Sequence, residues 1–185
     1  MLKILAISAV LGSLGGVGGG ALATVLQSQP GGSKPMVLVE PGEPGAVSSF
    51  SFSASDLAAG DWIQRPVDLV NKSKRPLSTF ALTITASPSS ALDTDVVNGL
   101  QLQIDRCRKA WRFDGQTRHY ACTSPVIPVV STRPVIGTDI VLGNVDDIRR
   151  KKGKAHLLVT LTLPPTAPNE LQGQSSTLTY TFGAA

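Results

Sequence analysis

The sequence predicts an all-β protein, an antiparallel β-sandwich or barrel with one disulfide-stapled hairpin. Segments in which apolar and polar residues alternate strictly recur along the chain, and turns rich in Gly, Pro, Asn and Ser separate them. Strict alternation buries one face of a strand and leaves the other in water, which is typical of antiparallel sheets. No helical period is sustained, and the two cysteines flank an Asp-Gly turn signal.

Residues 1–23 are expected to be a secretory signal peptide. Lys3 precedes an apolar run that ends in the small-x-small tripeptide ALA at 21–23. A retained membrane anchor is the alternative, because the apolar run to Leu26 approaches the ~20 residues that span a bilayer. The many glycines between positions 12 and 20 make a poor permanent helix. We therefore expect a secreted protein that meets the membrane only transiently, through its signal peptide.

Residues 24–49 form a Pro/Gly-rich N-terminal segment with one apolar island, Met36, Val37, Leu38 and Val39. Four β-prone residues between prolines predict a short edge strand, because proline is tolerated at sheet edges. The island is the candidate for contact between subunits. Strand alternation sorts it into the pairs 36/38 and 37/39, and which pair would face a core stays open. Pairing within its own domain, or no fixed structure, is the alternative.

Residues 50–185 are expected to form the β-sandwich domain, which is long enough for a sizeable core. The first predicted strand, at 49–55, begins at the boundary of this domain. The only helix-like piece is 144–153, with Asn144 as its expected cap and Gly153 at its end. The predicted strands are SFSFSAS at 49–55, WIQRPVDLV at 62–70, STFALTITA at 78–86, GLQLQID at 99–105, PVIGTDIVL at 134–142, HLLVTLTL at 156–163 and STLTYTF at 176–182.

Cys107 and Cys122 are expected to close a β-hairpin. The stretch FDGQ at 113–116 lies midway between them, and Asp-Gly between strand-forming residues is a strong hairpin signal. An even number of cysteines in an exported protein favours a disulfide. A redox site would need a Cys-x-x-Cys motif or an adjacent base, and the sequence has neither. Closing a loop of this size contributes ~3 kcal/mol by restricting the unfolded chain.

The composition excludes several classes of protein. Hydrophobic residues make up 42% of the chain and charged residues 16%, so it is not a disordered polyelectrolyte. A net charge of +4 is too slight to indicate specific nucleic-acid recognition. Neither His119 nor His156 has a second ligand at helical spacing, and no nucleophile elbow is present, so we expect no cofactor, no metal and no enzymatic activity. Asp93 and Asp95 are weak calcium candidates, with an Asx-type turn as the alternative.

Basic residues form two groups that are candidates for contact with anionic wall or matrix polymer. The alternative for each group is an ordinary solvated turn. One group accompanies the hairpin and the other lies in the run RRKKGK; the candidates are Arg106, Arg108, Lys109, Arg149, Arg150, Lys151 and Lys152.

The stretch DLAAGDWIQRPVDLVNKSKRPLSTFALTITA resembles the camelysin/TasA family of secreted biofilm-matrix proteins. The matching motif is a Leu-x-x-Gly-Asp turn and a strand that ends in Leu-x-Asn, here Leu57, Gly60, Asp61, Leu69 and Asn71. The later stretches TDVVNGLQLQIDRCRKAW, YACTS and LLVTLTLPPTAPNELQGQSSTLTYTF look like the actinobacterial variety, and the resemblance covers about 50–182. The usual Phe-Ser-Asp-Thr stretch after the signal peptide is replaced by the Pro/Gly-rich segment.

The resemblance implies a jelly-roll-like β-sandwich that is exported and assembles into surface or matrix fibres by donor-strand complementation. The first functional hypothesis is therefore a structural subunit whose main partner is itself. A monomeric wall- or glycan-binding module that uses the basic hairpin is the second. A camelysin-type metallopeptidase is the third, and no metal motif here matches it.

Overall fold

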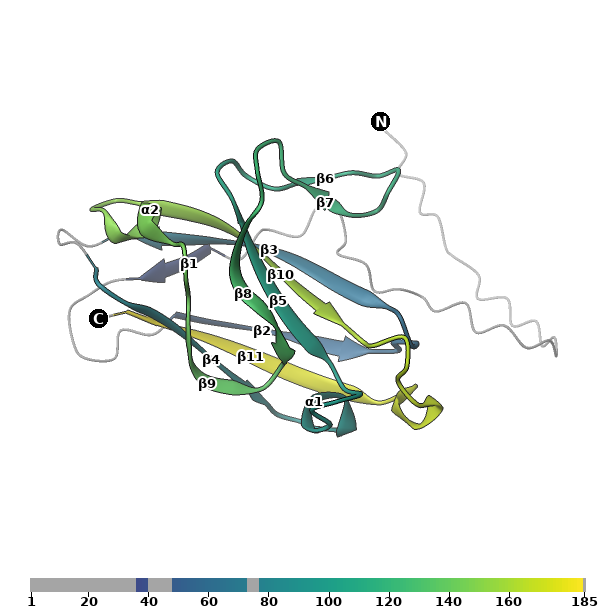
Figure 1. Cartoon of the computed structure of the whole chain (residues 1–185). Helices are drawn as coiled ribbons and strands as arrows, with labels where there is room; N and C mark the ends of the chain where they lie inside the picture. The colour runs from purple at the N-terminus through teal and green to yellow at the C-terminus, as the bar shows by residue number, and fades with distance from the viewer. Residues whose placement is uncertain (1–35, 40–47, 73–76, 185) are drawn as a thin grey trace, which may run out of the picture.

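The computed structural model describes residues 36–39, 48–72 and 77–184 (Figure 1). The predicted signal peptide and the remainder of the Pro/Gly-rich segment, at 24–35 and 40–47, lie outside these residues. Within the described part of the chain, no helix has the length and apolar character needed to cross a membrane.

Two sheets form the body of the protein. The five-stranded sheet has the order β1-β3-β10-β5-β8, and the four-stranded sheet has the order β2-β11-β4-β9. The first comprises β1 (Met36–Val39), β3 (Trp62–Asn71), β10 (Lys154–Thr162), β5 (Gln101–Cys107) and β8 (Ile127–Pro134). The second comprises β2 (Ser48–Ser55), β11 (Ser175–Ala184), β4 (Phe80–Ala86) and β9 (Gly137–Val141).

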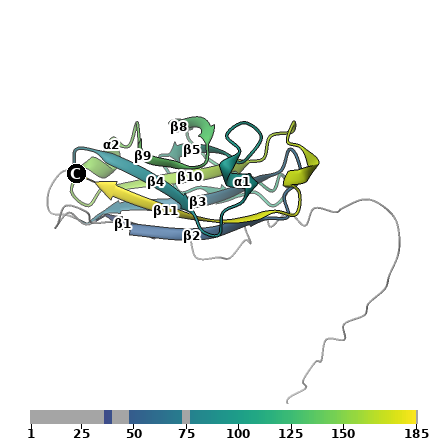
Figure 2. The ribbon, with the colours of Figure 1, turned by 90° about the horizontal axis from the view of Figure 1, so that it is seen from below.

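The connection of these strands is that of a jelly roll. From β2 to β5 the chain alternates between the two sheets, and from β9 to β11 it alternates again. Between them β5 and β8 are antiparallel neighbours in one sheet. A double-layered sheet of eight long strands linked in this way is a jelly roll. Figure 1 shows the five-stranded sheet above the four-stranded sheet, and in Figure 2, seen from below, the two sheets overlie each other. The predicted β-sandwich is confirmed.

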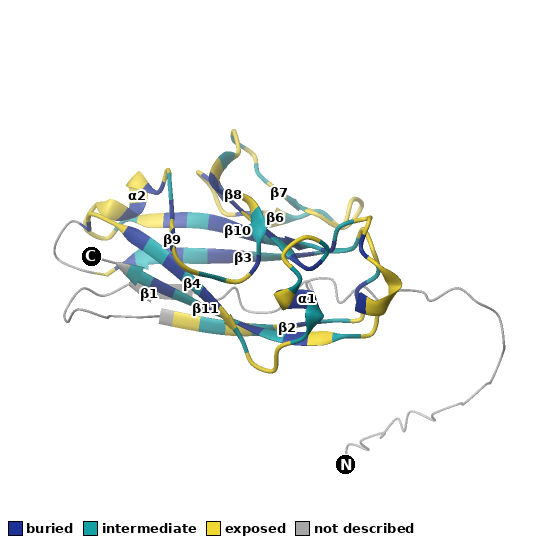
Figure 3. Cartoon of the chain, turned by 60° about the horizontal axis from the view of Figure 1, so that its bottom comes forward, coloured by how far each residue is buried: buried dark blue, intermediate teal, exposed yellow. Residues whose placement is uncertain are grey.

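The core lies between the sheets because each strand buries every second residue. Figure 3 shows buried and part-exposed residues alternating along the strands. On the edge strand β2, the rings of Phe50 and Phe52 stack on Tyr180, with centroids 5.0 and 5.1 Å away. The largest fully buried side chains include Leu69, Leu82, Ile84, Leu102, Ile104, Leu157, Leu161 and Phe182.

A short hairpin is inserted between β5 and β8. Its strands are β6 (Arg112–Phe113) and β7 (Tyr120–Ala121). Three short helices complete the described part of the chain: α1 (Ala91–Thr94), α2 (Asp146–Arg149) and the 3₁₀ helix Asn169–Leu171. Figure 1 shows α1 and α2 at opposite ends of the sandwich.

The helix expected at 144–153 is shorter and begins later. Val145 is the N-cap of α2 and provides no side-chain cap. Asn144 instead has a positive φ of 53°, and its side-chain amide donates to the carbonyl oxygen of Pro128 at 2.8 Å. The helix ends at Arg149, and Gly153 closes the following turn by donating its N–H to Arg150.

Candidate functional site

Strand β1 is an added edge of the five-stranded sheet. It pairs with β3 alone and runs parallel to it, whereas every other described strand pair is antiparallel. Val37 is opposite Leu69 and Val39 is opposite Asn71, and both of these β3 residues are buried. The island at 36–39 therefore pairs with its own domain in the isolated chain, one of the arrangements that the sequence left open.

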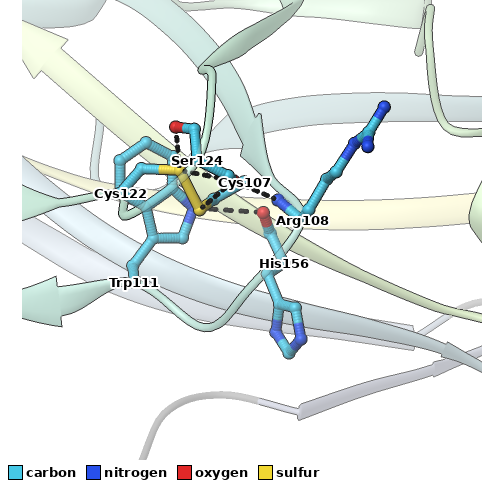
Figure 4. Close-up of a disulfide and its surroundings, with 6 residues drawn as sticks. All are labelled: Cys107, Arg108, Trp111, Cys122, Ser124 and His156. Carbon is cyan, nitrogen blue, oxygen red and sulfur yellow. Dashed lines mark hydrogen bonds between the residues drawn. A yellow bond between two sulfur atoms is a disulfide. The ribbon is translucent and has the colours of Figure 1, made fainter.

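The disulfide predicted between Cys107 and Cys122 is present and closes the hairpin, with an S–S distance of 2.01 Å and a Cα–Cα distance of 5.8 Å (Figure 4). The pair forms a second small core with Trp111 and Leu158. This core lies on the outer face of the five-stranded sheet, the face that points away from the four-stranded sheet. The indole N–H of Trp111 donates to the carbonyl oxygen of His156 on β10 at 3.0 Å. The disulfide therefore holds the hairpin on the sheet.

Two residues of β3, Trp62 and Gln64, hold the second half of the hairpin, at His119 and Tyr120. The exposed ring of His119 stacks on Trp62 of β3 at a centroid distance of 4.0 Å. The N–H of Tyr120 donates to the side-chain oxygen of Gln64 at 2.9 Å. His119 and His156 lie at different places on the outer face, in contact with Trp62 and Asp68 respectively.

Arg106 is not a surface residue, although its position beside the hairpin predicted one. It is only 8% exposed, and its guanidinium forms an ion pair with Asp147 of α2. A buried cation needs such a partner because desolvation of an unpaired charge is costly. The structure therefore removes Arg106 from the candidate contact residues for anionic polymer.

The other predicted basic residues are exposed. Arg108 and Lys109 directly follow β5. Arg149 ends α2 and is bound to Asp146 at 3.4 Å. Arg150, Lys151 and Lys152 continue in the turn that precedes β10.

Lys72 was missed by the sequence analysis and lies beside that turn. It is exposed and follows Asn71, whose backbone N–H donates to the carbonyl oxygen of Gly153 at 2.9 Å. The sequence carried the signal in the basic stretch NKSKR, but its proximity to RRKKGK depends on the pairing of β3 with β10.

Asp93 and Asp95 organise the segment around α1. Asp93 completes a capping box with Ser90, and the side-chain oxygen of Asp95 accepts from the N–H groups of Val97 and Asn98 at 2.9 Å, which is an Asx turn. Burial acts to raise the pKa of Asp93, but hydrogen bonds from Ser176 and Ser89 outweigh it and lower the pKa.

A surface pocket of about 470 Å³ opens beside Asp93. Apolar side chains, including Val96, Pro134 and Ile136, form much of its wall. Across the described residues, no group of three or more His, Cys, Asp or Glu side chains is arranged to hold a metal ion.

Asp68 is the centre of a charged cluster on the outer face. Its carboxylate binds Lys154 at 2.9 Å and the Nδ1 atom of His156 at 2.5 Å. Burial acts to raise the pKa of Asp68, but these two partners outweigh it, so the pKa lies below its ordinary value. The cluster spans β3 and β10, directly beside β1.

No protein-family model and no curated protein matches the chain. Among solved structures, the chain is similar to PliG from Salmonella Typhimurium, a periplasmic lysozyme inhibitor of g-type lysozyme. The identity is 8%, the TM-score is 0.32, and the match covers 82% of this chain and 98% of that chain. PliG from Aeromonas hydrophila has 10% identity, a TM-score of 0.30 and the same coverages. Similarity of this degree carries no conclusion about function.

Proposed function

We propose that this protein is a secreted structural subunit of extracellular fibres, assembled by exchange of strand β1 between neighbours. The observation that carries the proposal is the position of β1: a four-residue strand at the sheet edge, parallel to β3 and separated from β2 by the Pro/Gly-rich sequence at 40–47. Such a strand docks on the domain mainly through its pairing with β3, and a neighbouring subunit has the same β3 edge.

Exchange would preserve the contacts that β1 makes in the isolated chain. An added strand gains backbone hydrogen bonds along a sheet edge and side-chain contacts on alternate positions. The same register on β3 serves a strand from the same chain or from a neighbour. If each subunit receives one strand and gives one, the contact is head-to-tail, and such contacts generate filaments when they do not close into rings.

The sequence supports the same function. The signal peptide expected at 1–23 indicates export, and the resemblance to the camelysin/TasA family favours a matrix fibre. A peptidase activity is not part of the proposal. Within the described residues no group of three or more His, Cys, Asp or Glu side chains is arranged to hold a metal ion, and Asp68, the carboxylate partner of His156, also forms an ion pair with Lys154.

A monomeric wall- or glycan-binding module is the second candidate. The exposed basic residues near α2 favour it, because they are available to a polymer without any assembly of the protein. Fibres in electron micrographs of the mature protein support the first candidate. A strict monomer that binds cell-wall material in a saturable, salt-dependent manner supports the second.

Deletion of residues 27–43 tests the proposal. The shortened chain lacks β1 and keeps every other strand that the structure describes. We therefore expect a folded monomer by sedimentation and circular dichroism that forms no fibres. Fibres that persist unchanged after this deletion would rule out β1 as the exchanged strand.

A further inference from the structure

Three basic segments that are far apart in the sequence meet at one end of the five-stranded sheet. Lys72 follows β3, and the turn 149–153 leads into β10, the neighbour of β3. The third segment contains Arg108 and Lys109 at the end of β5. It is joined to α2 by the ion pair between Arg106 and Asp147.

Three carboxylates in this region each bind a cation: Asp68 binds Lys154, Asp146 binds Arg149, and Asp147 binds Arg106. The partly buried Asp105 of β5 instead accepts a hydrogen bond from Gln103. The remaining exposed cations make no ion pair with any described residue. They are Lys72, Arg108, Lys109, Arg150, Lys151 and Lys152, which we call the basic surface.

The turn that carries half of this surface is fixed to the core. The buried side-chain amide of Asn71 donates to the carbonyl oxygens of Ile148 and Arg150 at 3.0 and 3.1 Å. Ile148 is itself fully buried, and Gly153 lies so close to the turn that a Cβ atom there would come within 1.9 Å of the carbonyl oxygen of Asp147. The backbone that displays the cations is thus preorganised, which reduces the ordering cost of binding.

We propose that the basic surface binds a linear anionic polysaccharide outside the cell. Cations carried by several segments match a polymer that repeats its negative charge along its length. Attraction of this kind depends on the number of cations and weakens as salt rises. The inference does not rest on strand exchange, because none of the six residues belongs to β1.

Duplex DNA is disfavoured as the occupant. Its bases are read by a helix or a two-stranded ribbon that enters the major groove. Near the basic surface the described helix is α2, which has four residues and is anchored to the body of the protein through Ile148. The two-stranded hairpin β6–β7 follows Lys109, but the disulfide and the Trp62–His119 stack hold it on the sheet. The surface therefore offers charge contacts without a free element for reading base edges.

Binding to immobilised polygalacturonate, measured as a function of sodium chloride concentration, tests the proposal. The test variant carries R150Q, K151Q and K152N, where Asn suits the positive φ of 59° at position 152. The matched control carries R112Q, R118N and R133Q, which removes the same charge from outside the basic surface; Asn again suits the positive φ of 60° at position 118. A second test variant, R108Q with K109Q, examines the segment after β5. Thermal unfolding of every variant checks that it is folded.

We expect the triple test variant to bind about 100-fold more weakly than the native protein at low salt, since each cation near an anionic surface contributes about a factor of five. The control should stay within about threefold of the native affinity, and the slope of log affinity against log salt should become shallower by roughly 2 to 3 in the test variant.

Equal losses in test and control, or no binding by the native protein at low salt, would overturn the inference. Tighter binding to duplex DNA than to polygalacturonate at equal salt would overturn the choice of polymer. The chain lacking 27–43 should bind as the full chain does, which separates this result from the fate of the strand-exchange proposal.

Discussion

Tyr180 places a hydroxyl group in the core without a hydrogen-bond partner among the described residues. Its side chain is fully buried, and this burial raises the pKa of Tyr180 well above the ordinary value. An unsatisfied buried polar group costs about 1–3 kcal/mol. The residue therefore stabilises the fold through its ring, which stacks on Phe50 and Phe52, and not through its hydroxyl.

Replacement of Tyr180 by Phe should raise the free energy of unfolding by about 1 kcal/mol, because the ring stays and the unsatisfied hydroxyl is removed. Urea unfolding followed by circular dichroism measures the change. Tyr120→Phe, on the half-exposed hairpin, is the matched control and should change stability little. A loss of stability in Tyr180→Phe would mean that the hydroxyl has a partner.

Asp68 should make stability depend on pH in the acidic range. Because its pKa is lower in the folded chain than in the unfolded chain, its contribution is complete above the unfolded value of about 4 and is lost as pH falls through the folded value. Asp68→Asn should cost about 1–3 kcal/mol at neutral pH, where Lys154 and His156 lose their carboxylate acceptor.

The same variant should lose less further stability than the native protein when the pH is lowered through the acidic range. Urea unfolding at a series of pH values measures both effects. Asp139→Asn, at an exposed position on β9, is the control and should follow the native protein. If Asp68→Asn and the native protein lose stability in parallel below about pH 4, the ion cluster does not contribute.

Individual residues show where reasoning from the sequence succeeds and where it fails. The cysteines could be paired because the evidence needed no knowledge of the fold: an even count, an expected signal peptide and a turn signal between them. Arg106 could not be assigned correctly, because its partner Asp147 is 41 residues away and meets it only through the fold. Lys72 was missed for the same reason, since its basic neighbours are brought to it by β10.

At the scale of elements, alternation predicted most long strands, because burial of one face imposes a period of two on the sequence. Strand β8 was missed because it contains Pro128 and Pro134, which interrupt a strand pattern. The structure explains why both prolines are tolerated, because β8 is an edge strand of its sheet and its register with β5 is irregular. The order of strands in the sheets is set by contacts between distant segments and could not be read from alternation.

For β1, the register now distinguishes the two pairs that alternation left open. Positions 37 and 39 are opposite buried Leu69 and Asn71, whereas positions 36 and 38 are opposite Asp68 and Val70, which are only partly buried. Residues paired across neighbouring strands share a face of the sheet. The register therefore assigns 37 and 39 to the face of β3 that packs in the core.

A peptide spanning 34–43 should bind the chain that lacks 27–43. Val37→Asp in the peptide should weaken binding by more than tenfold, because a carboxylate would be placed on the core side without a partner. Leu38→Asp carries the same charge on the other face and should bind within a few-fold of the native peptide. Isothermal titration calorimetry measures all three. Equal weakening by the two substitutions would show that the register does not control docking.

At the scale of the whole molecule, strand exchange makes each subunit both a donor and an acceptor. The donor is β1, and the acceptor is the edge of β3 that β1 occupies in the isolated chain. Because the donor strand and the acceptor edge are different parts of the chain, deletion of β1 leaves the β3 edge able to accept a strand. A chain without β1 is therefore an acceptor that cannot donate, and it should stop growth at one end of a fibre.

Small amounts of the chain lacking 27–43, added to assembling native protein, should shorten the fibres in proportion to the fraction added. Fibre lengths in electron micrographs measure the effect, and a tag on the shortened chain should be found at fibre ends. As the control, the same chain is first saturated with the peptide spanning 34–43, which fills its β3 edge and should abolish the shortening. If the fibre lengths do not change when the shortened chain is added, the subunits are joined by surfaces other than β1 and β3, such as the edge strands β8 and β9.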